Sequence, residues 1–106
     1  MAYNLIFTDA FEKDLDSILD YIINKLYNPT AAARLYKNVK ITFAKITDLP
    51  EMYPLHPLKR LSDKGFRFCQ VGNYLMFYTI DHERQIIYAR AMVYGAMDLT
   101  KVPNLS

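Results

Sequence analysis

The chain has 106 residues, of which 52% are hydrophobic and 23% charged, and its formal net charge is +2. This length suits one domain, 1–106, and leaves no room for a second hydrophobic core, while the composition excludes a disordered chain. A single cysteine, Cys69, excludes an intrachain disulfide. No apolar run approaches the roughly 20 residues of a membrane span, and the N-terminus lacks the pattern of a signal peptide. We therefore expect a cytoplasmic protein without a membrane anchor.

The first predicted elements are a short strand and a long amphipathic helix. Residues 1–8 contain an alternating run in which Tyr3, Leu5 and Phe7 share one face, as in a strand. Asp9 is a favoured N-cap residue and Glu12 follows at the spacing of a capping box, which predicts a helix over about 9–27. Apolar residues recur there at helical spacing, namely Phe11, Leu15, Ile18, Leu19, Ile22, Ile23 and Leu26.

A second helix is predicted directly after the first. Asn28 can cap a helix and Pro29 is favoured at its first position, so this helix should run from there to about Leu49. Two long helices joined by so short a link must pack as an antiparallel hairpin, which we place over residues 9–49. The apolar line of the second helix is Ala32, Leu35, Val39, Phe43 and Ile46.

The second half of the chain predicts strands. Pro50, Pro54 and Pro57 enforce an extended connection that ends in a polar stretch over residues 59–64. From Gly65 the hydrophobic period changes to two, which predicts strands over about 66–71, 74–81 and 85–93. Their links are too short for crossovers, so the strands of 65–93 should be antiparallel neighbours, followed by a tail over 94–106. The predicted fold class is α+β, a helical hairpin packed on an antiparallel sheet in the order β-α-α-β-β-β.

Charge is unevenly distributed along the chain. Residues 1–28 carry a net charge of −3, whereas residues 29–106 carry +5. Such asymmetry marks a nucleic-acid face or an acidic partner in some proteins. Oppositely charged surfaces on two helices are the simpler interpretation, which we favour.

Several short motifs, in order along nearly the whole chain, resemble those of the RelE/ParE toxin superfamily. They include Asp-Leu-x-x-Ile-x-x-Tyr-Ile over residues 14–22, Asn-Pro-x-Ala-Ala over 28–32, Gly-Phe-Arg over 65–67 and Val-Gly-Asn-Tyr over 71–74. Two more follow, Phe-Tyr-x-Ile-Asp over 77–81 and Tyr-Gly-x-x-Asp over 94–98. The resemblance implies the toxin of a bacterial type II toxin–antitoxin pair, neutralised by a co-encoded antitoxin that wraps it with a helix and often an added strand.

This superfamily contains two chemistries, so the fold alone does not choose between them. RelE-like members cut mRNA on the ribosome with basic and aromatic residues on the sheet, whereas ParE-like members poison DNA gyrase and need no nuclease site. Neither implies a cofactor or a membrane partner, and DNA would be contacted only through the antitoxin.

Cleavage of RNA needs proton-transfer groups and cations over the phosphate, for which Arg67, Arg90 and Tyr78 are the candidates. The nuclease pattern is missing at three places. Apolar Cys69 and Val71 share the strand face of Arg67, Leu75 follows the aromatic Tyr74, and residues 96–97 are Ala-Met where a basic residue is expected. We therefore favour ParE-like inhibition of DNA gyrase over a ribosome-dependent mRNA endonuclease. A third interpretation is an attenuated homologue that only binds antitoxin, in which Ala-Met is a natural or introduced loss.

Other candidate residues concern binding. For contact with the target or a phosphate, the candidates are basic residues at and after the end of the proline-rich connection: Lys59, Arg60, Lys64 and Arg67. The alternative is that they belong to a solvated loop without a binding role. For antitoxin binding we expect the exposed flank of the helical hairpin and a sheet surface with Tyr78, Tyr88, Arg90 and Tyr94.

The remaining reactive residue types suggest no further site. His56 lies between prolines and His82 in a predicted turn, so both are expected on surface loops. No spacing of Cys and His suits a metal, and Cys69 in a strand is expected to be a small buried apolar residue.

Overall fold

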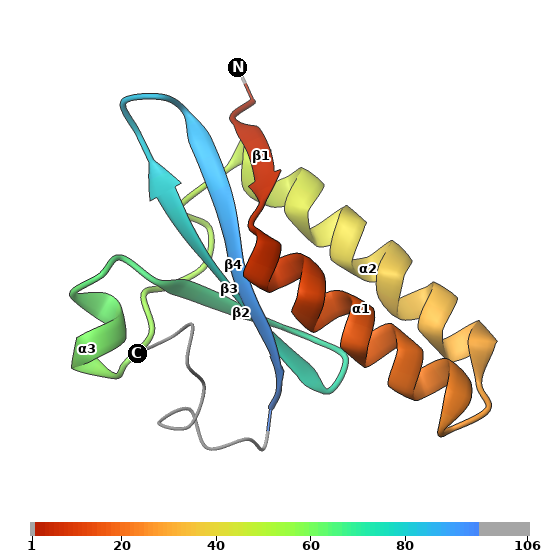
Figure 1. Ribbon diagram of the computed structural model, residues 1–106. Helices are drawn as coiled ribbons and strands as arrows, with labels where there is room; N and C mark the ends of the chain where they lie inside the picture. Colours follow the sequence, from red (N-terminus) through yellow and green to blue (C-terminus); the bar gives the residue numbers. More distant parts are fainter. Residues whose placement is uncertain (1, 96–106) are drawn as a thin grey trace.

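The computed structural model describes residues 2–95 of the chain. Two helices, α1 (Asp9–Asn24) and α2 (Pro29–Asp48), lie side by side on one face of a four-stranded sheet (Figure 1). The strands are β1 (Asn4–Phe7), β2 (Arg67–Val71), β3 (Tyr74–Asp81) and β4 (Ile86–Tyr94). A four-residue helix, α3 (Lys59–Ser62), lies on the other side of the sheet. The expected β-α-α-β-β-β order is confirmed, with α3 as an addition in the stretch predicted to be only polar.

The helical hairpin forms where the apolar pattern predicts it, with one change at its start. Asn28 caps α2 as expected, because its side-chain oxygen accepts a hydrogen bond from the Ala31 N–H at 3.0 Å. The cap of α1 is Thr8, not Asp9, since Thr8 Oγ1 accepts from the Phe11 N–H at 3.2 Å. The Thr8 hydroxyl also donates to the carbonyl of Ala89 at 2.8 Å, a contact that fixes the start of α1 to β4.

The sheet is mixed, in the order β1-β4-β3-β2. The expected antiparallel pairing holds for β2 with β3 and for β3 with β4. The first strand joins the last in parallel, with Asn4 opposite Ile86 and Phe7 opposite Ala89. Beyond Phe7 the chain turns into α1, and Asp14 of that helix accepts a hydrogen bond from the Met92 N–H at 3.0 Å. The carboxylate of Asp14 therefore accepts the hydrogen bond of a β4 backbone N–H that lies beyond the end of β1.

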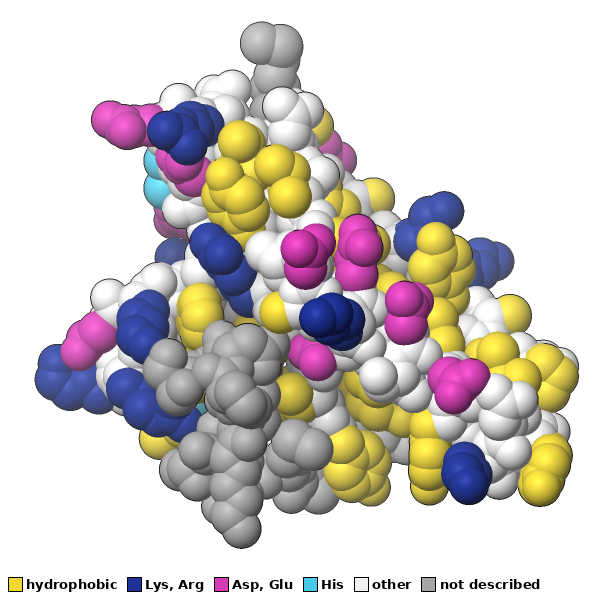
Figure 2. All heavy atoms as spheres, in the orientation of Figure 1, with side chains coloured by type: hydrophobic (Ala, Val, Ile, Leu, Met, Phe, Trp, Pro, Cys, Tyr) yellow, Lys and Arg dark blue, Asp and Glu magenta, His cyan; other side chains and the backbone are white. Residues whose placement is uncertain are grey.

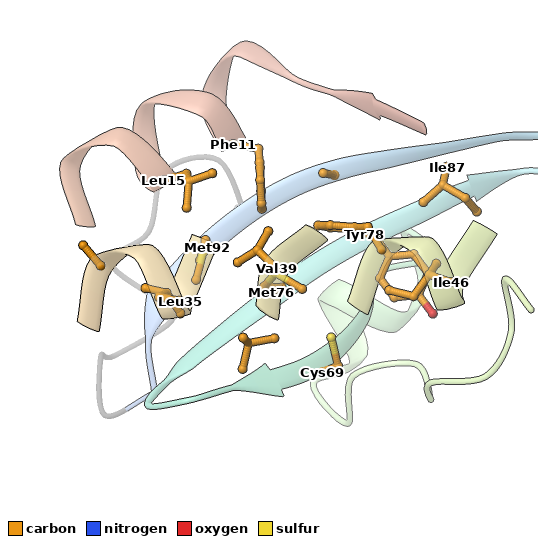
Figure 3. Close-up of a cluster of buried hydrophobic side chains, with 14 of the residues drawn as sticks. Phe11, Leu15, Leu35, Val39, Ile46, Cys69, Met76, Tyr78, Ile87 and Met92 are labelled. Atoms are coloured by element: carbon orange, nitrogen blue, oxygen red, sulfur yellow. The ribbon is translucent and has the colours of Figure 1, made fainter. Parts of the chain in front are cut away.

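The main core lies between the helical hairpin and the sheet. Figure 3 shows side chains from α1 and α2 meeting those of the strands, among them Phe11, Val39, Met76 and Tyr78, all fully buried. Cys69 is also buried there, and burial raises the pKa of its thiol to about 11, which confirms its prediction as an apolar core residue. Most of the apolar stripe of each predicted helix thus faces the sheet, but α1 ends at Asn24, before the expected end near residue 27, and Ile23 and Leu26 are exposed.

A second, smaller cluster covers the opposite face of the sheet near α3. It is formed by apolar side chains of α3 and the strands, namely Leu61, Phe66, Phe77, Ala91 and Val93. The segment before α3 folds over it, since the His56 N–H donates to the Phe66 carbonyl at 3.0 Å. The His56 ring contacts Phe68 and Phe77 with centroid distances of 4.7 and 5.6 Å. The expectation of a surface position for His56 is therefore wrong, because this side chain is only 9% exposed.

Acidification is expected to destabilise the fold through His56. Burial, and next the charge of Arg60, lower the pKa of this imidazole below its ordinary value, and its Nδ1 accepts a hydrogen bond from the Leu58 N–H at 3.1 Å. As the pH falls through about 6.5, the unfolded chain gains a proton on His56 while the folded chain does not. Because the unfolded state then binds more protons, stability is lost as the pH falls in this range.

Urea denaturation at about pH 7.5 and about pH 5.5 measures this loss as a fall in the midpoint. The variant His56→Gln removes the titration and should show a smaller fall. The matched control His82→Gln removes the other histidine, which is exposed, and should keep the full acid loss. Equal falls in wild type and His56→Gln would contradict this role of His56.

Candidate functional site

The face of the sheet that points away from the helical hairpin carries a partly exposed patch, in which Ile6 is exposed and the others are half-buried, and which we call the outer-face patch: Ile6, Ile86, Tyr88 and Arg90. Leu5 and Ile87 pack into the hairpin core, so by alternation Ile6, Ile86 and Tyr88 point to the opposite side. Ile6 lies directly opposite Tyr88 in the β1–β4 register and is 43% exposed. Figure 2 shows hydrophobic side chains gathered over the region where β1 and β4 lie side by side.

Arg90 lies on this face at a β-bulge. Phe77 pairs with Ala91 but Tyr78 pairs with Ala89, so Arg90 is the extra residue of β4. Such bulges re-aim side chains next to sites of binding or catalysis. The Arg90 guanidinium lies over the ring of Tyr88 at 4.7 Å from its centroid, and its Nε donates to Thr79 Oγ1 at 2.9 Å. The cation is thereby held in one orientation beside an aromatic ring.

Arg67 and Tyr78, the other two candidates for a nuclease, lie on the opposite side of the sheet. Arg67 shares its strand face with Cys69, and its Nη1 donates to the Tyr53 carbonyl at 2.6 Å. The Tyr78 ring is 0% exposed, and its hydroxyl donates to the Pro50 carbonyl at 2.8 Å. Burial raises the pKa of Tyr78 to about 12, so this phenol keeps its proton. Both side chains anchor the segment that follows α2.

The structure therefore does not bring all three nuclease candidates together, although Arg67 lies directly opposite Tyr78 in the β2–β3 register. Arg90 lies on the outer face, whereas Arg67 and Tyr78 face the helical hairpin and bond to backbone carbonyls. A phosphate on the outer-face patch would meet Arg90 without either partner. For the same reason Tyr78 is removed from the expected antitoxin surface, while Tyr88 and Arg90 stay on it.

The remaining predicted binding residues are dispersed. Lys59 and Arg60 lie on α3 and Lys64 follows it, with Lys59 Nζ paired to Asp63 at 2.9 Å. Arg67 is separate from this basic group because of its bond to Tyr53. Tyr94 ends β4 with its ring 5.9 Å from that of Tyr74, which packs against the hairpin core. Tyr94 thus lies apart from the outer-face patch, and residues 96–97 lie outside the described part of the chain.

The hairpin carries its charges on exposed surfaces. Figure 2 shows acidic side chains in a row along α1, where Asp9, Glu12, Asp16 and Asp20 are exposed. On α2 the exposed charged residues before its last residue, Asp48, are basic: Arg34, Lys37, Lys40 and Lys45. The uneven charge of the sequence is therefore expressed as two oppositely charged helix surfaces, as expected.

Residues 2–95 offer neither a metal site nor a membrane-spanning helix. No group of three or more His, Cys, Asp or Glu side chains within that range could hold a metal ion. In the same range, no helix combines the length and the apolar character that crossing a membrane requires.

Comparisons with known proteins agree with this fold. The chain is similar to a protein of the Mycobacterium tuberculosis toxin–antitoxin complex RelBE2, with 18% identity, a TM-score of 0.62, and 89% of this chain and 99% of that chain covered. It is similar to a protein of the chromosomal ParDE toxin–antitoxin system from P. aeruginosa, with 15% identity, a TM-score of 0.69, and 88% and 96% covered. A mutant of the E. coli toxin RelE in the free state gives 15% identity, a TM-score of 0.58, and 91% and 86% covered.

At these identities the solved structures show a shared fold alone. No curated protein sequence is significantly similar to the chain. The family is shown by sequence instead, because a model described as the ParE toxin of the type II toxin–antitoxin system parDE matches residues 5–99. The chain belongs to the ParE toxin family of type II toxin–antitoxin systems.

Proposed function

We propose that this toxin acts by binding a protein target, DNA gyrase, and that it needs no nuclease site. The observation that carries the proposal is the placement of the three nuclease candidates. Arg67 and Tyr78 face the helical hairpin and bond to the carbonyls of the segment after α2, while Arg90 is alone of the three on the outer face. Cleavage of RNA requires a proton acceptor, a proton donor and cations around one phosphate, and these side chains do not surround one.

Gyrase supercoiling in vitro tests the target. Purified toxin at excess over gyrase is expected to abolish supercoiling of a relaxed plasmid, and a cell-free translation reaction is expected to run at its normal rate with the same toxin. Full supercoiling activity at excess toxin would overturn the gyrase target. Cuts in ribosome-bound mRNA, lost in Arg67→Ala or Arg90→Ala, would favour the nuclease instead.

Failure of both assays would favour the third interpretation, an attenuated homologue that only binds antitoxin. Residues 96–97 provide its test, because Ala96→Arg or Met97→Arg restores a basic residue where the nuclease pattern has one. Growth arrest by either variant, with normal growth of the parent, would identify a lost activity.

The cellular partner that we propose for regulation is a co-encoded antitoxin. The outer-face patch supplies an aromatic ring, a fixed cation and the exposed Ile6, and Tyr and Arg are residue types that dominate binding energy at interfaces. The basic surface of α2 suits an acidic antitoxin segment along the hairpin flank. Binding along this flank should weaken as salt is raised, whereas binding at the outer-face patch depends less on salt.

A further inference from the structure

A hydrogen-bonded chain of three side chains lies at the corner of the molecule where β1 begins and the β3–β4 turn approaches the end of α2 (Figure 1). Tyr3 Oη lies 2.9 Å from His82 Nδ1, and His82 Nε2 lies 3.1 Å from a carboxylate oxygen of Glu51. The tyrosine and histidine rings meet edge to face, with centroids 5.8 Å apart. The imidazole thus lies between the phenol and the carboxylate, within hydrogen-bond distance of both.

Each member of the series is held by its own backbone. The Tyr3 N–H donates to the Thr47 carbonyl at 2.8 Å, which fixes the start of β1 against the end of α2. The Glu51 turn is closed by a bond from the Met52 N–H to the Leu49 carbonyl at 3.0 Å. The turn of His82 is closed by Asp81 Oδ1, which accepts from the Arg84 N–H at 3.0 Å. The backbone segments that carry the three groups are therefore each fixed by hydrogen bonds.

This arrangement has the geometry of an activated nucleophile. When the imidazole hydrogen is on Nε2, that nitrogen donates to Glu51 while Nδ1 accepts the hydrogen of the Tyr3 hydroxyl. A nucleophile within hydrogen-bond reach of a base, which is itself oriented by a third group, is the signature of nucleophilic activation. We propose that Tyr3 is an activated nucleophile that accepts an acyl group, with His82 as its general base and Glu51 as the residue that orients the base.

The surroundings favour an acyl donor over a charged one. A hollow of about 420 Å³ adjoins the three side chains, and its other lining residues are Leu49, Pro50 and Met52. All three are apolar, so they suit an acyl chain. The only charged groups among the lining residues are Glu51 and, when protonated, His82.

The step consumes one activated, uncharged acyl donor, such as an activated ester or an acylimidazole. The Tyr3 oxygen forms a bond to the acyl carbon, and the bond from that carbon to its leaving group breaks. The phenol proton passes to His82 Nδ1 and then to the leaving group, which restores the neutral imidazole. The product is an ester on Tyr3, and no oxidant or reductant is needed.

Acetylation of the purified chain by N-acetylimidazole tests the proposal, with each tyrosine followed over time by peptide mass spectrometry. Tyr27 is the internal reference because it is 85% exposed, more than the half-buried Tyr3. If exposure alone governs the rate, Tyr27 reacts first. With general-base catalysis, which typically contributes at least about a hundredfold, Tyr3 should react at least about tenfold faster than Tyr27 even in this partly exposed setting.

Two variants and a pH series separate activation from mere accessibility. His82→Gln keeps a hydrogen-bond acceptor but removes the base, and should bring Tyr3 to the rate of Tyr27 or below. Glu51→Gln should slow Tyr3 less, because the base remains. In the wild type the Tyr3 rate relative to Tyr27 should rise with pH, because only a neutral imidazole can accept the phenol proton.

Circular dichroism establishes that each variant is folded, and the wild-type pH series needs no variant at all. A Tyr3 rate at or below that of Tyr27, an unchanged rate in folded His82→Gln, or a ratio independent of pH would each overturn the proposal. These outcomes are independent of gyrase inhibition, because the assay contains only the chain and the acyl donor.

Discussion

Replacement of Phe43 with alanine is expected to lower the free energy of unfolding by about 3–5 kcal/mol. Phe43 is fully buried in α2, and its ring lies 5.6 Å from those of both Phe7 and Phe11. It therefore joins β1 and both long helices in one aromatic cluster. Truncation removes its apolar contacts and leaves a cavity that rigid neighbours fill only in part. Because domains of this size have a total stability of about 5–15 kcal/mol, much of the population should unfold at moderate urea concentrations.

The matched control for Phe43→Ala is Tyr36→Ala, which truncates an aromatic side chain in the same helix. Tyr36 is 44% exposed and contacts Lys40, whose ammonium lies 5.4 Å from the ring centroid. Its truncation should cost under about 1.5 kcal/mol, since exposed cation–π contacts contribute about 0.5–1 kcal/mol. Urea denaturation gives both values. Equal losses in the two variants would contradict the placement of Phe43 at the centre of the core.

Replacement of Arg90 with alanine is expected to weaken antitoxin binding by about 2 kcal/mol, or roughly thirtyfold in Kd. The bulge in β4 and the bond to Thr79 hold the guanidinium over Tyr88 before any partner arrives, so little side-chain entropy is lost on binding. Titration calorimetry with the antitoxin from the neighbouring reading frame measures the change. Tyr88→Ala should cause a comparable loss, because it removes the ring that supports the cation.

The control for this second prediction is Arg84→Ala, in the turn between the same two strands. Its guanidinium approaches only Asp81, at 3.9 Å, and its side chain is 75% exposed. Truncation there removes the same formal charge without an ordered contact, so binding should change less than about threefold. Equal weakening by Arg84→Ala and Arg90→Ala would show that net charge, and not the outer-face patch, determines affinity.

The helical hairpin could be predicted almost completely from the sequence, because a stripe of apolar residues at helical spacing has only one way to be buried. Phe11, Leu15 and Ile22 of the first stripe are all buried against the sheet. Asn28 followed by proline gave the start of the second helix for an equally local reason. The antiparallel strands followed from short links, which allow no other connection.

The remaining features depend on contacts between distant segments, which no local pattern encodes. Thr8 replaces Asp9 as the cap because its hydroxyl also reaches Ala89, on a strand at the far end of the sequence. His56 was expected on the surface because prolines flank it, yet its segment folds over aromatic side chains of β2 and β3.

The candidate site shows the same limit. The sequence does not show that β4 has an extra residue between Ala89 and Ala91, so alternation fails beyond Arg90 and cannot give the pairing of β4 with β3 there. The chain of Tyr3, His82 and Glu51 was missed altogether. Tyr3 lies before β1, Glu51 follows α2, and His82 lies in the β3–β4 turn, so the three residues are far apart in the sequence. Each of them alone is a residue type that is common on protein surfaces.

The parallel pairing of β1 with β4 has a consequence for how the toxin is made. Asn4 emerges early from the ribosome, but the strand that it pairs with begins at Ile86. The pairing can therefore form only after nearly the whole chain has been synthesised. Until then, the apolar faces of β1 and α1 lack their partner in the sheet, and the outer-face patch does not exist, since Ile6 and Tyr88 come from those two strands. Folding of the nascent chain should therefore be completed late, as expected where long-range pairings dominate. An antitoxin already present in the cell would meet each new toxin as it acquires its binding surface.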